Sequence, residues 1–208
     1  MSSGRNSGLT TDSKLARKAA TPSSLEKNIN RKRGGEVSLN SFAFLFSEII
    51  LYSQNRVLGI QDLEQKLGEI GYRVGIRVYE LTMLRERVIK RETRVINVLL
   101  YINSVVWKFL FGKPADSLEK STENKDEYMI TDNEPLLSKF ISVPKEMASF
   151  SPCSFVAGIV EAILDSCQCP ARVTAHTVPV DGKPHRTVIL MKIDKSVLAR
   201  EERLDTSK

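Results

Sequence analysis

The side chains best suited to metal or nucleophile chemistry are three cysteines and two histidines, Cys153, Cys167, Cys169, His176 and His185. Structural zinc sites use cysteine pairs with about two to four residues between them. Only one residue separates Cys167 from Cys169, and the two histidines bracket a predicted turn, so we expect no metal site. An odd cysteine count without a secretory signal favours a reducing compartment and no disulfide framework.

A lone carboxylate, Glu161, interrupts the apolar segment 155–164 and could serve as a catalytic acid. Acid–base chemistry needs a second carboxylate, a histidine or a nucleophile at a matching spacing, and the neighbouring sequence offers none. The chain also lacks a glycine-rich phosphate loop and a nucleophile elbow. We therefore interpret Glu161 as the acceptor of a capping or interhelical hydrogen bond. We expect that the chain has no catalytic residues, binds no cofactor and is not an enzyme.

The elements that would position these residues are organised around the most apolar run of the chain, Glu92–Phe111. Its apolar residues recur every three or four positions on a stripe wide enough to be buried on more than one side. About 20 apolar residues could also cross a bilayer, but polar side chains such as Asn103 and Lys108 interrupt the run. We expect a core helix that ends at Gly112–Pro114.

The net charge of +6 has its origin at the N-terminal end. Residues 1–35 contain eight basic and two acidic side chains, whereas the remainder contains 23 of each. We predict a disordered basic tail over residues 1–36, which is too polar to bury a core, and a neutral domain over residues 37–208. Arg31–Arg33 could touch acidic membranes, but a solvated tail is the simpler interpretation, and no nucleic-acid partner is expected.

Along the chain, the first three predicted segments are helical, and the strand signals follow them instead of alternating with them. Helical patterns are found near 38–55, 61–85, 92–111, 155–164 and 196–204, and strand patterns at 128–131, 139–143, 172–178 and 187–193. We interpret 85–92 as a charged linker and 117–127 as an exposed polar loop. This order favours an α+β fold with helices packed on one face of an antiparallel sheet, for which four strands are expected.

The first predicted helix is too apolar for the surface of a monomer. Phe42, Leu45 and Ile49 follow one face of it, but Phe44 and Leu51 point away from that face. Excess apolar surface of this kind is typical of an obligate interface. In the second helix Gly71 and Gly75, four residues apart, would let another backbone approach closely.

Several stretches resemble, in the same order, the small core subunits of the transport protein particle (TRAPP) complex, of the subunit-five type. The resemblance covers about residues 36–203 and rests on SLNSFAFLFSEII, LEQKLGEIGYRVGIRV, RETRVINVLLYINSVVWKFLFGKPADSLE, EPLLSKFISVPKEMASFSPCSFVAGIVEAIL and PARVTAHTVP. It implies helices on one side of a twisted four-stranded antiparallel sheet. It also implies a heterodimer with a related small subunit through the first two helices. The interface residues expected from the pattern and the resemblance together are Phe42, Phe44, Leu45, Ile49, Leu51, Tyr72, Ile76 and Tyr79.

The resemblance further implies a role in vesicle tethering and in nucleotide exchange on a Rab-type GTPase, in endoplasmic reticulum to Golgi traffic and in autophagy. The exchange surface of such complexes is built by other subunits, so this chain is expected to be a scaffold. Its location would be cytoplasmic, peripherally associated with endoplasmic reticulum and Golgi membranes. A related branch carries an acylated cysteine before the central helix. Residues 87–93 contain none, so covalent lipid is not expected.

Two other functions remain open from the sequence. The apolar helices could line a pocket for a lipid or small ligand. The basic tail could bind RNA or DNA, although the neutral domain makes this the weaker alternative.

Overall fold

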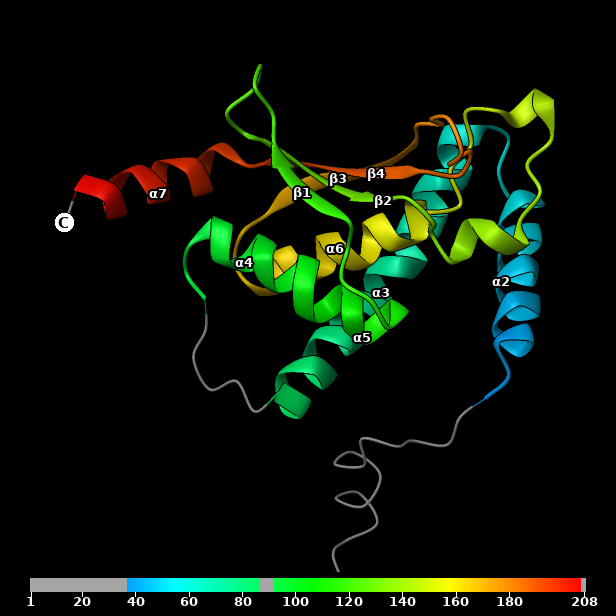
Figure 1. The fold of residues 1–208 in the computed structure, drawn as a ribbon, viewed down its shortest axis with the longest axis horizontal. Coiled ribbons are helices and arrows are strands. Elements are labelled where there is room, and N and C mark those ends of the chain that lie inside the picture. Colours follow the sequence, from blue (N-terminus) through cyan, green and yellow to red (C-terminus); the bar gives the residue numbers. More distant parts are fainter. Residues whose placement is uncertain (1–36, 87–91, 207–208) are drawn as a thin grey trace, which may run out of the picture. The chain divides into compact units, whose positions relative to one another are not determined.

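The computed structural model describes residues 37–86 and 92–206, within a compact unit that spans Gly35–Lys208. The predicted basic tail and most of the predicted charged linker lie outside the described residues. Figure 1 shows the elements of the described part. The strands are β1 (Ser117–Lys120), β2 (Glu127–Asp132), β3 (Ala171–Thr177) and β4 (Thr187–Ile193). The helices are α2 (Leu39–Gln54), α3 (Ile60–Glu86), α4 (Val95–Tyr101), η1 (Ile102–Val106), α5 (Trp107–Phe111), η2 (Leu137–Phe140), η3 (Lys145–Met147), α6 (Ser154–Ser166) and α7 (Lys195–Thr206).

The four strands form one antiparallel sheet in the order β1-β2-β4-β3. Ile130 pairs with Ile189, and Val173 pairs with Met191, so the buried side chains of neighbouring strands share one face. In β3 and β4 buried and more exposed residues alternate, as they do when only one face of a sheet is covered. In Figure 1 the helices α4, α5 and α6 lie below the sheet, and α3 begins beside one end of the sheet and descends below it. The predicted α+β fold is confirmed.

Two predictions around β2 were wrong. Segment 117–127 begins with the strand β1, which pairs with β2, instead of being all loop. Segment 139–143 is not a strand, because it begins at the end of the 3-10 turn η2. A strand needs a neighbour that supplies hydrogen bonds, and β2 already has β1 on one side and β4 on the other. Local sequence patterns do not reveal which strand edges are taken.

The central apolar run forms a continuous helical segment, α4, η1 and α5. It begins at Val95 because Arg94 is still extended, with φ −87° and ψ 133°. It ends at Gly112, whose φ of 77° is the left-handed conformation that glycine adopts readily. Ile102 and Val106 are fully buried within the π-helical part. Among the described helices, none has the combination of length and apolar character that a bilayer crossing demands.

Helices α3 and α6 cross at very short range because glycine occupies the contact points. A Cβ atom on Gly71 would lie 2.0 Å from the Phe155 carbonyl oxygen, and one on Gly158 would lie 2.0 Å from the Gly68 carbonyl oxygen. A Cβ atom on Gly75 would lie 2.7 Å from the Cβ atom of Ala162. The predicted close approach at Gly71 and Gly75 is confirmed, and it leaves α6 enclosed between α3 and the sheet.

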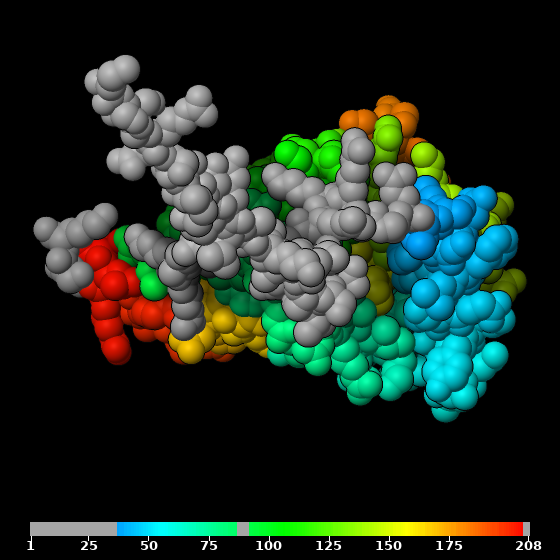
Figure 2. Space-filling view, turned by 90° about the horizontal axis from the view of Figure 1, so that it is seen from below, coloured from blue at the N-terminus to red at the C-terminus, as the bar shows by residue number. Residues whose placement is uncertain are grey.

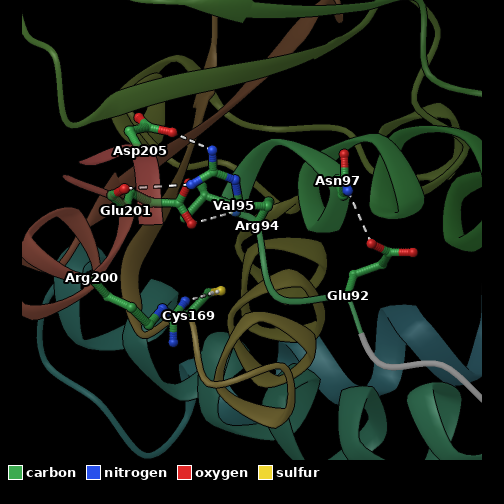
Figure 3. A network of polar contacts seen from close by, with 8 residues as sticks. All are labelled: Glu92, Arg94, Val95, Asn97, Cys169, Arg200, Glu201 and Asp205. Carbon is green, nitrogen blue, oxygen red and sulfur yellow. Dashed lines mark hydrogen bonds and ion pairs between the residues drawn. The ribbon is translucent and has the colours of Figure 1, made fainter. Parts of the chain in front are cut away.

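The last helix, α7, is attached by a polar network (Figure 3). Arg94 forms ion pairs with Glu201 and Asp205, and the Val95 N–H donates to Oε1 of Glu201 over 3.1 Å. Arg200 donates from Nη2 to the Cys169 sulfur at 3.2 Å. These contacts tie α7 to the start of α4 and to the turn between α6 and β3.

Candidate protein interface

The outward face of α2 carries large apolar side chains that the rest of the described chain leaves exposed. Phe44 and Leu45 are 74% and 59% exposed, and Leu51 and Tyr52 are 50% and 54% exposed. Leu51 follows Phe44 by seven residues, and Tyr52 follows Leu45 by seven, which is about two helical turns. The four side chains therefore form two rows along one side of the helix. We call these four residues the α2 face. Figure 2 shows α2, in blue, at the surface beside the start of α3.

The opposite side of α2 is anchored through few residues. Only Phe46 and Ser53 are buried in this helix. The Phe46 ring stacks on Phe42 with a centroid distance of 6.0 Å and meets Phe155 of α6 edge-on at 5.6 Å. The Ser53 hydroxyl is satisfied within the helix by the Ile49 carbonyl oxygen, 2.8 Å away. A helix of this apolarity gains little from so narrow an attachment, since apolar stabilisation grows with the area removed from water.

The eight residues expected at an interface are distributed over three environments. Phe44, Leu45 and Leu51 are exposed together on the α2 face. Phe42 and Ile49 are partly buried on its inner side, against the core. The three residues on α3 are divided, with Ile76 37% exposed, Tyr79 packed against the core, and Tyr72 donating its hydroxyl to Asp165 over 2.9 Å.

Two exposed apolar residues, one on α2 and one in the turn after it, were not predicted. Tyr52 lies seven residues after Leu45, and this spacing could have revealed it. The guanidinium of Arg56 stacks over its ring, 3.5 Å from the centroid, and leaves the tyrosine more than half exposed. Leu58, in the turn after α2, is fully exposed. No periodic pattern covers a turn, so sequence reasoning had no signal for Leu58.

The residues with potential metal or nucleophile chemistry are dispersed in the structure. All three cysteines are free and buried. Burial raises the pKa of the Cys153 thiol, which makes it a poor nucleophile at neutral pH. His176 bonds to Thr174 on the exposed side of β3. Within residues 37–86 and 92–206, no three His, Cys, Asp or Glu side chains are grouped so that they could hold a metal ion.

Glu161 lies close enough to the backbone N–H of Val173 in β3 for this group to lower the pKa of its carboxyl group. The capping or interhelical hydrogen bond expected for Glu161 stays a prediction. Burial is the main cause that raises the pKa of Glu161, and the nearby carboxylate of Asp165 raises it further. Glu161 lies in an open groove of about 790 Å³ between α3, α6 and β3.

The core between the central helix and the sheet is closely filled. The buried carboxylate of Asp132 accepts hydrogen bonds from Trp107 Nε1 at 3.1 Å and from Lys113 Nζ at 3.2 Å. Beside it a cavity of about 10 Å³ is lined by residues that include Trp107, Cys153 and Ile189. Pockets for small ligands have volumes of about 300–1,000 Å³, so this part of the described core has no room for an acyl chain.

Comparison with known sequences links the described domain to one family. The family model described as transport protein particle (TRAPP) component matches residues 42–194. Trafficking protein particle complex subunit 5 of Dictyostelium discoideum is 54% identical over 170 residues, which cover 81% of this chain and 91% of that protein. Its namesake in Homo sapiens is 41% identical over 182 residues, covering 87% and 93%.

The fold also matches a solved structure at low identity. The crystal structure of a trafficking protein particle complex subunit 3 from Naegleria fowleri, covalently bound to palmitic acid, has a TM-score of 0.64 to this chain. The two share 16% sequence identity, and the match covers 74% of this chain and 94% of the other. At that identity the likeness supports the shared fold alone.

Proposed function

The chain belongs to the transport protein particle (TRAPP) component family, and from this we propose that it is a non-catalytic scaffold subunit of a vesicle-tethering complex. In this role the α2 face, with help from α3, binds a sister small subunit to form a heterodimer. The relatives are named as subunits of a trafficking complex, which supports other small subunits as the partners.

One observation carries the proposal, namely the exposure of the α2 face. Four large apolar side chains, two of them aromatic, line one side of a helix that buries only two residues of its own. Aromatic anchors are enriched at the energetically dominant centres of interfaces. A single partner helix laid along the two rows would cover all four side chains at once.

The finer role follows from the family. We propose that the assembled complex serves a Rab-type GTPase as its exchange factor, in endoplasmic reticulum to Golgi traffic and in autophagy, and that other subunits form the exchange surface. The chain would then be cytoplasmic and reach membranes only through the complex. The naming of the relatives as complex subunits, and the burial of the Cys153 thiol 3.5 Å from the Ser138 hydroxyl, support a role without chemistry of its own.

The interface is tested by placing a charge on the α2 face. Phe44→Asp and Leu45→Asp would bury an unpaired carboxylate against the partner, which costs several kcal/mol. We expect each variant, expressed with a tag, to lose co-purification with the other small subunits while it stays folded. Ile96→Asp is the matched control, because Ile96 is 48% exposed on α4, away from α2. Wild-type recovery of partners with both α2 variants would disprove the assignment.

The scaffold role is tested separately from the interface. The isolated chain should not accelerate nucleotide release from Rab-type GTPases, whereas the complete complex should. Complexes prepared with Phe44→Asp should lose exchange activity only to the extent that they lose subunits, as judged by sizing. Exchange catalysed by the isolated chain would contradict the scaffold role.

A further inference from the structure

A groove that shares no lining residue with the α2 face has the features of a strand-binding site. It has a volume of about 790 Å³ and is bounded by α3 on one wall and β3 on the other. Its lining on α6 consists of Ser154, Ala157, Gly158 and Glu161, which share one stripe of this helix. The first three are small, so they leave space next to β3, and at Gly158 the backbone of α3 comes into contact with α6.

The wall formed by β3 is an open edge of the sheet. The Val178 N–H donates to the Arg186 carbonyl oxygen at 2.8 Å, and the Asp194 N–H donates to the Pro170 carbonyl oxygen at 3.0 Å. In an antiparallel ladder the bonded pairs alternate, so the even-numbered residues of β3 face β4. The N–H and C=O groups of Val173, Ala175 and Thr177 therefore point to the edge that β4 does not occupy.

Only part of this edge is already satisfied. The Val173 N–H lies near the Glu161 carboxylate and lowers its pKa, so the backbone groups of β3 beyond Val173 are the ones left for a ligand. Apart from the bonds of the β3–β4 ladder, no backbone group of the described residues forms a hydrogen bond to Ala175. Ala175 is only 6% exposed, whereas Thr177 is exposed. Strand edges that are left unpaired readily pair with another extended chain unless they are blocked. The edge next to the groove thus offers donors and acceptors at strand spacing.

The charges in the groove differ between its two ends. At the end near Val173, Arg73 and Arg172 accompany Glu161. At the other end Glu64 lies among Gln61, Gln65, Ser154 and His176 without a lysine or arginine among the lining residues. Oε1 of Glu64 accepts the Ser151 N–H at 2.8 Å. Burial raises the pKa of the Glu64 carboxyl group, whereas the nearby His176 imidazole lowers this pKa to a smaller extent. A half-buried carboxylate next to a histidine remains a favourable position for a lysine or arginine.

We propose that this groove binds an extended segment of another protein chain, which adds a strand along the free edge of β3 and places a lysine or arginine side chain at Glu64. Main-chain hydrogen bonds to Ala175 and Thr177 would provide affinity, and the contact with Glu64 would provide specificity, as in other cases of strand addition. The site does not use the α2 face, so one chain could hold a sister subunit and the extended segment together.

The test uses a phage-displayed library of random 12-residue peptides selected on the full chain, with affinities of the selected peptides measured by fluorescence polarisation. We expect enrichment of peptides that contain Lys or Arg. Glu64→Gln keeps an acceptor for the Ser151 N–H but removes the charge, and should weaken binding about tenfold, because hydrogen bonds to charged groups are the stronger ones. Glu80→Gln, an exposed site on the same helix, is the control and should leave affinity unchanged.

The strand edge is tested by removing one backbone donor. Proline is tolerated on an edge strand where its missing N–H faces outward, so Thr177→Pro should leave the β3–β4 ladder intact and weaken peptide binding about fivefold or more. Thr177→Ala keeps the N–H and should bind as wild type. Thermal unfolding is used to check that each variant is folded. If Thr177→Pro does not fold, the binding of peptides to Glu64→Gln still tests the proposal.

Three results would overturn the proposal. One is the absence of enriched peptides, or enrichment of acidic ones. Another is binding that neither Glu64→Gln nor Thr177→Pro changes. The third is tighter peptide binding after Arg31, Lys32 and Arg33 are changed to alanine, since the groove would then belong to the chain's own basic tail. Phe44→Asp should bind peptides as wild type does, so failure here is distinguishable from failure of the α2 interface.

Discussion

Helices α2 and α6 are both strongly apolar, yet the fold treats them differently. Ten residues of α6 are buried, whereas only two residues of the longer α2 are. Helix α6 lies between the sheet and α3, but α2 touches the domain along one side only. Apolar composition therefore does not decide how deeply a helix is buried. The number of neighbours that can reach its faces decides it, and α2 has a face for which this chain provides no neighbour.

The side chains on the two helices fit this difference. The faces of α6 that meet α3 and the groove carry Ala157, Gly158 and Ala162, which let other backbones come close. The α2 face carries two aromatic residues and two leucines instead. Small residues suit contacts made within a tightly packed core, while large aromatic side chains suit pockets on a partner. The contrast predicts that changes in the two helices will fail in different ways.

The largest effect is expected where α3 and α6 cross. In Gly71→Ala the added Cβ would lie 2.0 Å from the Phe155 carbonyl oxygen, so the helices must separate. Overpacking typically costs about 1–3 kcal/mol, and more where backbone is struck, so we expect little folded protein by circular dichroism and thermal melting. The control is Gly68→Ala, whose Cβ would meet only the Ser154 carbonyl oxygen at 3.7 Å. Equal stability of the two variants would mean that the helices are not packed as closely as described.

A smaller effect is expected from loosening α2 alone. Phe46→Ala removes the ring that contacts Phe155, and we expect a loss of about 3 kcal/mol in the free energy of unfolding, as is usual for buried Phe→Ala changes. Hydrogen exchange should accelerate in α2 and stay slow in α6. Phe44→Ala, two residues earlier on the α2 face, should change stability by no more than about 0.5 kcal/mol. Acceleration throughout α6 would show that the two helices form one cooperative unit.

The smallest effect on stability is expected from the ionisation of Glu161 on α6. Burial and Asp165 raise the pKa of Glu161 from its ordinary value of 4.5, against the opposing effects of Arg172 and the Val173 N–H. The folded state therefore holds this proton more tightly than the unfolded chain does. The contribution to stability is full below pH 4.5 and is lost as the pH rises through the higher folded pKa.

Glu161→Gln keeps an acceptor for the Val173 N–H and removes the ionisation. Relative to wild type, the variant should gain stability between pH 4.5 and pH 7, in thermal melts measured across this range. Glu80→Gln is again the control, because its side chain is 59% exposed on α3. A Glu161→Gln profile that runs parallel to wild type would show that Glu161 is not desolvated against β3.

Much of this architecture could be predicted from local patterns. The helical spacing in 92–111, the strand patterns at 172–178 and 187–193 and the glycine pair in α3 correspond to elements of the structure, because each depends on residues close in sequence. Strand β1 could not be predicted, since Ser117–Lys120 is polar and becomes a strand only by pairing with β2. Tyr72 was expected at an interface through the family resemblance, whereas the structure directs its hydroxyl to Asp165 on α6.

The sequence by itself determined the class of the fold, the excess of apolar surface on the first helix and the family to which the chain belongs, because periodicity, composition and motif order are properties of the chain. Only the tertiary structure decided which apolar residues of α2 remain exposed, where β3 leaves an open edge, and that Glu64 lies half-buried beside His176. These features depend on which segments become neighbours. Packing and hydrogen bonding between residues far apart in sequence decide which segments lie side by side, and a local sequence pattern does not contain this information.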